Sequence, residues 1–351
     1  MTRRVDGLLS CPTPLDHGDI VQLAHGGGGT LTSRLIDRLF VPAFRNPHLD
    51  SLGDGAVVTV GDTRLAFTTD SFVVKPVFFP GGDIGSLSVH GTVNDLAMCG
   101  AEPLYLSAGL VIEEGFLMSD LERVVAAMAE ACGHVGVTLV TGDTKVVDRG
   151  KGDGIYVNTS GVGRVREGVS VGPARAAAGD AVLVSGPVGD HGIAVMAARE
   201  GIDLETELVS DSAPVVAPVG ALLEAVPETH VLRDPTRGGL ATALSEVAVA
   251  SKVGIRLEEA HIPVRDEVRG ACELLGFDPL YVACEGRFLA VVPGEQAEEA
   301  LLAVRSQPGG EGARLIGRVV AEDPGRLVLR TRIGSHRLLE RLSGEQLPRI
   351  C

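Results

Sequence analysis

Two periodicities of apolar residues alternate along the first half of the chain. Apolar positions three to four apart predict helices at 31–40, 87–100 and 119–133, the last with Ser119 as its cap. Short apolar and β-branched runs bounded by Gly and Asp predict strands at 56–60, 64–69, 104–110, 137–140 and 155–163. The first two strands flank Gly61-Asp62, which predicts a hairpin. We expect the run at 137–140 to be a buried strand.

The pattern begins again after a polar segment at 164–173. Strands are predicted near 181–184, 231–233, 255–257 and 287–292, with a last strand at 327–331 that closes the sheet. Helices are predicted at 193–200, 240–250 and 296–306. The pattern indicates an α/β (α+β) protein with two domains of mixed sheets and packed helices. We expect a leader at 1–43, domains at 44–168 and 169–340, and a mobile tail at 341–351.

Composition narrows the classes of partner. The chain has 351 residues and a net charge of −15, so nucleic acid is an unfavourable partner. Aromatic residues make up 3% of the chain, which argues against base-stacking surfaces. No apolar run is long enough to cross a membrane, and none of the six cysteines is arranged as CxxC. We expect a cytoplasmic protein with reduced thiols.

Four consecutive glycines, Gly26, Gly27, Gly28 and Gly29, precede the first predicted helix. Loop amides at a helix N-terminus attract anions, so this segment is a candidate phosphate site. It lacks the Gly-Lys-Ser/Thr of a P-loop. A flexible linker is the alternative interpretation.

Acidic residues recur beside the predicted strands. Asp54 precedes one strand, Asp70 follows another, and Asp143 follows a third with Lys145 two residues later. Asp95 lies beside Asn94 in a mostly apolar helix, where polar groups need a partner or a ligand. If these segments converge, the carboxylates form a site suited to Mg²⁺. Turn formation is the alternative role for Asp70.

The chain ends in Pro348-Arg349-Ile350-Cys351. Proline favours extended backbone before it, so the segment is predicted to be an extended tail that can carry the Cys351 thiol to a site elsewhere. An incidental cysteine on a loose end is the alternative. The other five cysteines are interpreted as small buried apolar residues, and His25, His90 and His191 as structural histidines.

Several motifs occur in an order that resembles a known superfamily. They are Gly53-Asp54-Gly55-Ala56, Thr69-Asp70-Ser71, Val93-Asn94-Asp95-Leu96-Ala97-Met98-Cys99-Gly100, Gly142-Asp143-Thr144 and Asp234-Pro235-Thr236-Arg237-Gly238-Gly239-Leu240. The order resembles the ATP-dependent superfamily of aminoimidazole ribonucleotide synthetase, selenophosphate synthetase and thiamine-monophosphate kinase. The glycine-rich leader, Gly189-Asp190-His191-Gly192, Ala283-Cys284-Glu285-Gly286 and the terminal Pro-Arg-Ile-Cys are similar to the HypE family of hydrogenase maturation factors.

This resemblance implies a two-domain aminoimidazole ribonucleotide synthetase-like fold and an ATP-dependent carbamoyl dehydratase. In the family, HypF carbamoylates the terminal cysteine, ATP drives dehydration to a thiocyanate, and cyanide passes to iron on a HypC–HypD complex for [NiFe] hydrogenase. A homodimer with ATP near its interface is also implied.

The resemblance makes Cys351 the carrier. Glu285 is the candidate base, because it follows an apolar run where burial would raise its pKa, and Lys145 is the candidate for stabilising the phosphoryl charge. Asp54, Asp70, Asp95 and Asp143 would hold Mg²⁺, and Gly26 to Gly29, Asn94, Asp95 and Thr144 would contact ATP. A salt-bridged structural role is the alternative for Glu285.

Two other functions are compatible with the motifs. A kinase or selenophosphate synthetase-like enzyme would phosphorylate a small diffusible substrate, and Cys11 lies where such an enzyme carries a reactive cysteine. A non-catalytic scaffold would present the tail to partners.

Overall fold

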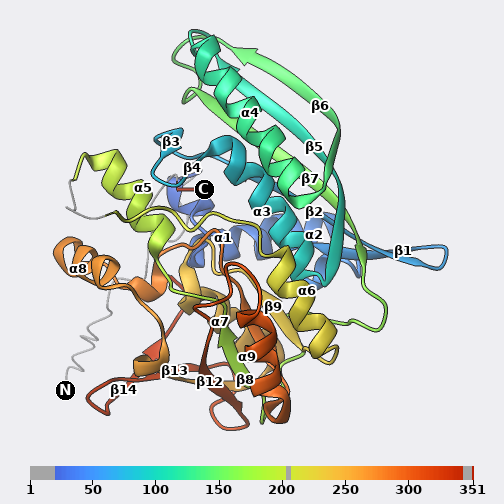
Figure 1. The fold of residues 1–351 in the computed structure, drawn as a ribbon, viewed down its shortest axis with the longest axis vertical. Helices are drawn as coiled ribbons and strands as arrows, with labels where there is room; N and C mark the ends of the chain where they lie inside the picture. Colours follow the sequence, from blue (N-terminus) through green and yellow to red (C-terminus); the bar gives the residue numbers. More distant parts are fainter. Residues whose placement is uncertain (1–19, 203–206, 343–349) are drawn as a thin grey trace, which may run out of the picture.

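The computed structural model describes residues 20–202, 207–342 and 350–351. Two β-sheets form its two halves, one above the other (Figure 1). The predicted leader and tail lie partly outside the described residues, at 1–19 and 343–349. Among the helices that are described, none has the length and apolar character needed to cross a bilayer.

The first sheet has five strands in the order β1-β2-β7-β5-β6. Its neighbours are antiparallel except for β5 and β6, which are parallel and joined through α4. The strands are β1 (Ala56–Val60), β2 (Thr63–Phe72), β5 (Ala101–Glu113), β6 (Thr138–Val147) and β7 (Ile155–Val165). The hairpin of β1 and β2 confirms the prediction from Gly61-Asp62.

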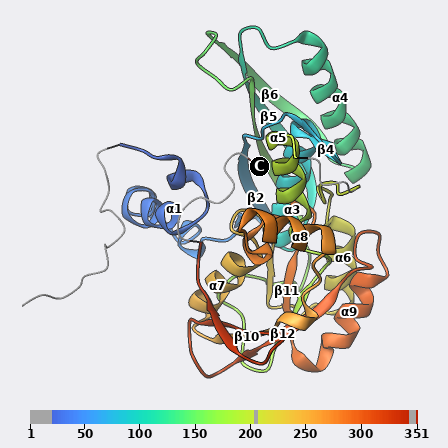
Figure 2. The same ribbon diagram turned by 90° about the vertical axis from the view of Figure 1, so that its left-hand side faces the viewer.

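Two helices, α3 (Ile84–Met98) and α4 (Met118–Val135), lie along one face of this sheet (Figures 1 and 2). Asp83 caps α3, its side chain accepting the amides of Gly85 and Ser86 at 2.7 and 3.0 Å. A Cβ atom on Gly85 would lie 2.2 Å from the Val124 carbonyl oxygen, so glycine permits the close approach of α3 and α4. The predicted Ser119 cap is wrong, because the N-cap of α4 is Leu117 and makes no side-chain cap bond.

Strand β6 differs from its prediction. It runs from Thr138 to Val147 and is exposed along nearly its whole length, because it forms an edge of the sheet. Asp143 and Lys145 therefore lie within a strand, and Asp70 likewise lies inside β2. The predicted buried strand was wrong because apolar composition does not distinguish an edge strand from a central one.

The second sheet has seven strands in the order β14-β13-β10-β12-β8-β11-β9. They are β8 (Ala181–Val184), β9 (Val231–Arg233), β10 (Gly254–Glu258), β11 (Leu289–Val292), β12 (Arg314–Val320), β13 (Leu327–Arg330) and β14 (His336–Leu339). The edge is thus β14, not the predicted strand at 327–331. Val182 and Val184 face one core cluster and Leu183 the other, so both faces of β8 are covered.

Helix α7 (Gly239–Ser251) packs on one face of the second sheet, while α6 (Val216–Ala225) and α9 (Ala297–Arg305) cover the other. Helices α5 (Asp190–Glu200) and α8 (Asp266–Leu275) form a further cluster beside them. The C-terminal end of α3 contributes Ala97 and Met98 to the core of the second half, so α3 connects the two halves.

Short elements complete the chain. The N-terminal helices (blue) project to one side of the two sheets in Figure 2. They are η1 (Leu23–Gly26), α1 (Thr30–Leu35), the π-helix η2 (Ile36–Phe40), α2 (Val41–Phe44) and η3 (Leu49–Ser51). The others are the β3 (Phe78–Phe79) and β4 (Gly82–Asp83) hairpin and three 3₁₀ turns, η4 (Glu259–His261), η5 (Pro279–Tyr281) and η6 (Gly294–Gln296).

Candidate active site

Three carboxylates from three segments meet between the two halves. Asp54 precedes β1, Asp95 lies on α3 and Asp234 follows β9. One oxygen of each lies within 4.8 Å of the others. Thr68 donates its hydroxyl to Asp95 at 2.7 Å, and Arg233 pairs with Asp54 at 2.9 Å. The cluster is a candidate divalent metal centre that joins the two domains.

Burial and mutual repulsion raise the pKa of these carboxyl groups. For Asp95 the cause is burial first, then the charges of Asp234, Asp54 and Asp70. Burial, with repulsion from Asp54, raises the pKa of Asp234 to about 8. Arg233 offsets part of this crowded negative charge, and Mg²⁺ with oxygen ligands would offset more of it. These residues therefore fit Mg²⁺.

The glycine-rich leader lies against the turn that follows Asp234. Arg237 of this turn donates to the Gly26 carbonyl at 3.4 Å and lies 3.7 Å from an Asp70 oxygen. Gly28 has a φ of +73°, and a Cβ there would lie 2.9 Å from the Arg237 Cβ. The leader, Asp70 and Arg237 therefore surround one side of the site. Arg237 is the cationic group beside Asp70, and Arg233 is the one beside Asp54.

The terminal thiol lies inside this site. Cys351 is 8% exposed and Glu285 is 4% exposed. The Cys351 thiol lies beside the Glu285 carboxyl, and among the described residues Glu285 Oε1 has no hydrogen-bond partner. Burial raises the pKa of the Cys351 thiol, with Arg237 opposing and Glu285 adding to the rise. Burial and then Asp234 raise the pKa of Glu285 well above its usual range.

Backbone contacts hold the last two residues. The Val73 amide donates to a terminal carboxylate oxygen of Cys351 at 3.1 Å. His191 Nε2 lies 2.6 Å from the Ile350 carbonyl oxygen. Both ribbon views place the C-terminus near α5, the helix that carries His191. The chain end therefore occupies a defined place in the site.

Glu285 is positioned by neighbours on both sides. Its amide donates to Asp211 at 2.9 Å, and its carbonyl accepts from Asn94 at 3.3 Å. Asn94 also donates to the Ala213 carbonyl and accepts the Val215 amide. In this structure the Asn94 side chain thus holds the segments around the candidate base.

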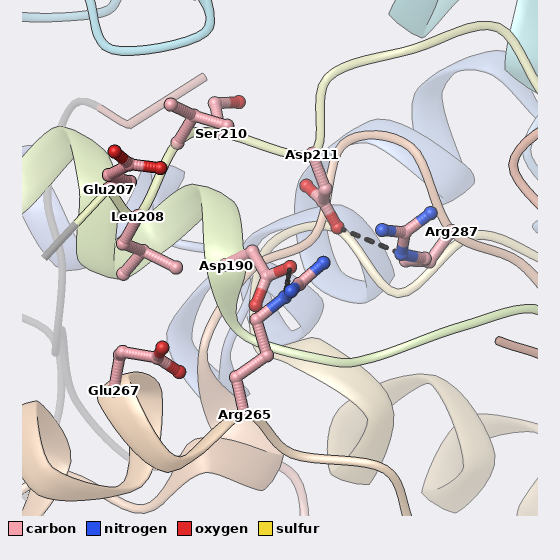
Figure 3. A pocket seen from close by; sticks show the side chains of 9 residues that line it. Asp190, Glu207, Leu208, Ser210, Asp211, Arg265, Glu267 and Arg287 are labelled. Atoms are coloured by element: carbon pink, nitrogen blue, oxygen red, sulfur yellow. Dashed lines mark hydrogen bonds and ion pairs between the residues drawn. The ribbon is translucent and has the colours of Figure 1, made fainter.

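A cavity of about 550 Å³ is lined by Asp190, Asp211, Arg265 and Arg287, among others (Figure 3). In its walls Arg265 pairs with Asp190 at 2.8 Å and Arg287 with Asp211 at 3.5 Å. Because Asp211 also accepts the Glu285 amide, this ion-paired wall supports the backbone of the candidate base.

Three predicted site residues lie elsewhere in this chain. Asp143, Thr144 and Lys145 are exposed on β6, where Asp143 and Lys145 pair at 2.8 Å. In the sheet order, β6 is three strands from β2, which carries Asp70, a distance of about 14 Å at ordinary strand spacing. Within one chain these residues do not join the carboxylate cluster.

Three site residues were not assigned from the sequence: Asp234, Arg237 and His191. Asp234 and Arg237 lie in a turn that was recognised as a possible anion site, yet nothing local indicates that Asp234 meets Asp54 and Asp95. The contact of His191 with the chain end spans 159 residues, which no local pattern can reveal.

The family is shown by comparison with known proteins. Residues 52–165 match the N-terminal domain of AIR synthase related proteins, and residues 177–330 match their C-terminal domain. The chain therefore belongs to the AIR synthase related proteins.

Comparison with individual proteins of that class narrows the family further. The chain is 51% identical over 331 residues to the carbamoyl dehydratase HypE of Azotobacter vinelandii, covering 94% of this chain and 97% of that protein. A HypE structure in complex with ATP is 48% identical with a TM-score of 0.80, covering 94% and 99% of the two chains. A chain of a HypE–HypF complex is 45% identical with a TM-score of 0.84, covering 88% and 99%. This protein belongs to the HypE family of carbamoyl dehydratases.

Proposed function

We propose that this protein uses ATP to dehydrate a carboxamide carried on the Cys351 sulfur, forming a thiocyanate that supplies the cyanide ligand of the [NiFe] hydrogenase iron. The observation that carries the proposal is the position of Cys351. Its thiol, at the end of the chain, lies against the buried carboxyl of Glu285 beside a carboxylate cluster. A C-terminus with no role in the reaction would not need to be buried at this position.

The reaction needs a leaving group and a base. An amide oxygen leaves poorly, so it first attacks the γ-phosphorus of ATP, and the bond from phosphorus to ADP breaks. One nitrogen proton is lost in that stage. Loss of the second nitrogen proton, with cleavage of the carbon–oxygen bond, releases phosphate and leaves the carbon–nitrogen triple bond. Glu285 is the base that we assign to the nitrogen protons, because it lies beside the Cys351 sulfur and burial raises its pKa, which makes it a stronger base than an exposed carboxylate.

Asp54, Asp95 and Asp234 would hold Mg²⁺, with Asp70 close by, and the metal would neutralise phosphate charge. Arg237 faces the sulfur and Asp70, so it can stabilise negative charge that develops on the transferred group. The glycines of the leader pack on Arg237 and would cover the phosphates from that side.

Carbamoylation requires the chain end to leave this position. The docked thiol is nearly buried and burial raises its pKa, so it is both inaccessible and a poor nucleophile. We propose that a HypF carbamoyltransferase loads the exposed end, that docking follows, and that a HypC–HypD complex then receives the cyanide. The five cysteines in the described residues are free thiols, which fits a reaction in the cytoplasm.

A homodimer would complete the site. The exposed edge β6 carries Leu139, Val140 and Val146, which are 41%, 58% and 67% exposed. We propose that β6 pairs with a second copy and brings Asp143, Thr144 and Lys145 to the partner's nucleotide. The support is that an uncovered apolar edge strand is a ready site for association.

Intact mass measurement tests the proposal. The protein is incubated with carbamoyl phosphate, ATP, Mg²⁺ and the carbamoyltransferase. The peptide that ends in Cys351 should first gain the mass of a carboxamide and then lose the mass of one water. A C-terminal peptide that never changes mass, together with ATP-dependent phosphorylation of a small molecule, would contradict the proposal.

A further inference from the structure

The last two residues are held through their main-chain oxygen atoms and not through the sulfur. The Ile350 carbonyl oxygen lies 2.6 Å from His191 Nε2, and a terminal carboxylate oxygen of Cys351 accepts the Val73 amide at 3.1 Å. The Ile350 side chain is 3% exposed and belongs to the core cluster of the first domain. Because neither polar contact uses the sulfur, both can form whatever group the sulfur carries.

The hydrogen-bond partners of His191 define its tautomer. A carbonyl oxygen can only accept, so Nε2 carries the hydrogen and Nδ1 accepts from the Ser210 hydroxyl at 2.7 Å. The Ser210 hydroxyl oxygen in turn accepts the Ser212 amide at 3.0 Å. Burial lowers the pKa of His191 to about 4, so the ring is neutral at pH 7. Nε2 therefore carries a hydrogen at neutral pH and donates it to the Ile350 carbonyl oxygen.

The ring is also held in a fixed place relative to Glu285. The Gly192 amide donates to the Ala283 carbonyl at 3.1 Å, and the Gly189 amide meets the Cys284 sulfur at 3.2 Å. The edge-to-face contact with Phe79, with centroids 5.5 Å apart, fixes the ring from another side. The N-terminal turn of α5, which carries His191, is thus hydrogen bonded to the two residues that precede Glu285.

We propose that His191 is a positioning residue that docks the Ile350 carbonyl and thereby sets the Cys351 sulfur against Glu285 for the dehydration step. This inference rests on the proposed function for its role in catalysis. His191 touches none of the reacting atoms, and it binds the chain end in the thiol, carboxamide and thiocyanate states alike. It favours dehydration and opposes loading by the carbamoyltransferase, since the docked sulfur is buried.

Four variants separate this role from a general effect on folding. His191→Phe keeps a ring beside Phe79 but removes the donor, and His191→Gln restores a donor. Ser210→Ala is a milder change that leaves the ring and removes its Nδ1 partner. The matched control is His90→Phe, since His90 is a second histidine of low pKa that bonds Ser212 at 3.2 Å, and no contact of its ring with Ile350 or Cys351 appears in the described structure.

The first measurement uses the full chain alone. Iodoacetamide is added without nucleotide or partner, and alkylation is followed on the Cys351 peptide by mass. His191→Phe should react about tenfold faster than the unmodified chain, as expected for loss of one buried hydrogen bond. Ser210→Ala should fall between the two, and His191→Gln and His90→Phe should match the unmodified chain. Equal rates for His191→Phe and the unmodified chain, with cooperative melting retained, would overturn the docking role.

The second measurement follows single-turnover dehydration of pre-carbamoylated chains. His191→Phe should slow dehydration by about tenfold, while carbamoylation proceeds at least as fast as in the unmodified chain. Faster alkylation with unchanged dehydration would overturn the positioning role. A third outcome is that His191→Phe is alkylated faster but neither it nor the unmodified chain forms thiocyanate. That result would contradict the proposed function and still support the docking contact. If His191→Phe does not fold, Ser210→Ala decides, and its failure to change either rate overturns the proposal.

Discussion

At the scale of single residues, the site combines buried acids with one buried thiol. Burial raises the pKa of Asp95, Asp234, Glu285 and Cys351 together, because each charge that forms lies near other acids and away from water. A thiol that stays protonated is a poor nucleophile. It suits a carrier, because the reaction needs the sulfur only as an attachment point while a carboxylate removes protons.

Glu285→Gln should reduce the rate of dehydration by about a hundredfold or more, since it removes the general base while keeping the shape of the side chain. Carbamoylation of Cys351 should continue. For the unmodified enzyme the dehydration rate should rise with pH, because the raised pKa keeps Glu285 protonated at low pH and the base forms only as pH approaches that pKa.

Single-turnover mass measurements over a range of pH, at saturating ATP and Mg²⁺, supply both results. Glu285→Asp is the matched control, as it shortens the side chain but keeps the carboxylate and the pH dependence. A Gln variant that dehydrates at the unmodified rate would remove Glu285 from the mechanism.

At the scale of elements, β6 is the part of the fold whose exposure a single chain does not explain. It pairs with β5 on one side, no described strand pairs with its other edge, and apolar side chains line it. The proposed pairing with a second copy would both cover this edge and deliver Asp143 and Lys145 to a site that they do not reach within one chain.

Val140→Arg should therefore convert the dimer to a monomer and lower activity, because it places a charge on the paired edge. Val249→Arg is the control, since Val249 is 51% exposed on α7 of the other domain. Sedimentation velocity measures the change. If both variants sediment like the unmodified chain, β6 is not the contact.

Mixing two inactive variants tests whether pairing through β6 also completes the active site. Asp143→Asn and Asp54→Asn chains, each inactive alone, should regain about a quarter of the unmodified activity after exchange of subunits, because half of the dimers are mixed and each has one intact site. Asp62→Asn, in an exposed turn, is the control for the exchange procedure. An inactive mixture, with mixed dimers demonstrated by mass, would place Asp143 outside the partner's site.

At the scale of the whole molecule, the carboxylate cluster connects the two domains. Asp54 and Asp95 belong to the first domain and Asp234 to the second, and α3 packs into the core of both. A bound cation would therefore act as a bridge, so its binding energy would appear as stability of the joined domains.

Mg²⁺ with a non-hydrolysable ATP analogue should raise the melting temperature of the unmodified protein, by the equivalent of about 2.7 kcal/mol at a hundred times the dissociation constant. Asp234→Asn should lose most of this gain although Asp54 and Asp95 remain. Without metal it should melt no lower than the unmodified chain, because it removes a carboxyl crowded by its neighbours. Calorimetry with EDTA as the metal-free reference tests this, and a full Mg²⁺ gain in Asp234→Asn would exclude Asp234 as a ligand.

Local sequence predicted many of the helices and strands, the hairpin of β1 and β2, and the candidacy of Asp54 and Asp95, because periodicity and turn chemistry are carried by neighbouring residues. The resemblance of the motifs to a family supported the roles of Glu285 and Cys351. Helices α6 and α8 and strands β12 and β14 were not predicted. Tertiary structure decided which candidates meet. It added Asp234 to the cluster, placed Arg237 beside Asp70, left Asp143 and Lys145 on an exposed edge, and joined His191 to the chain end. These are contacts between distant segments, and they depend on strand order and domain packing, which a local pattern does not specify.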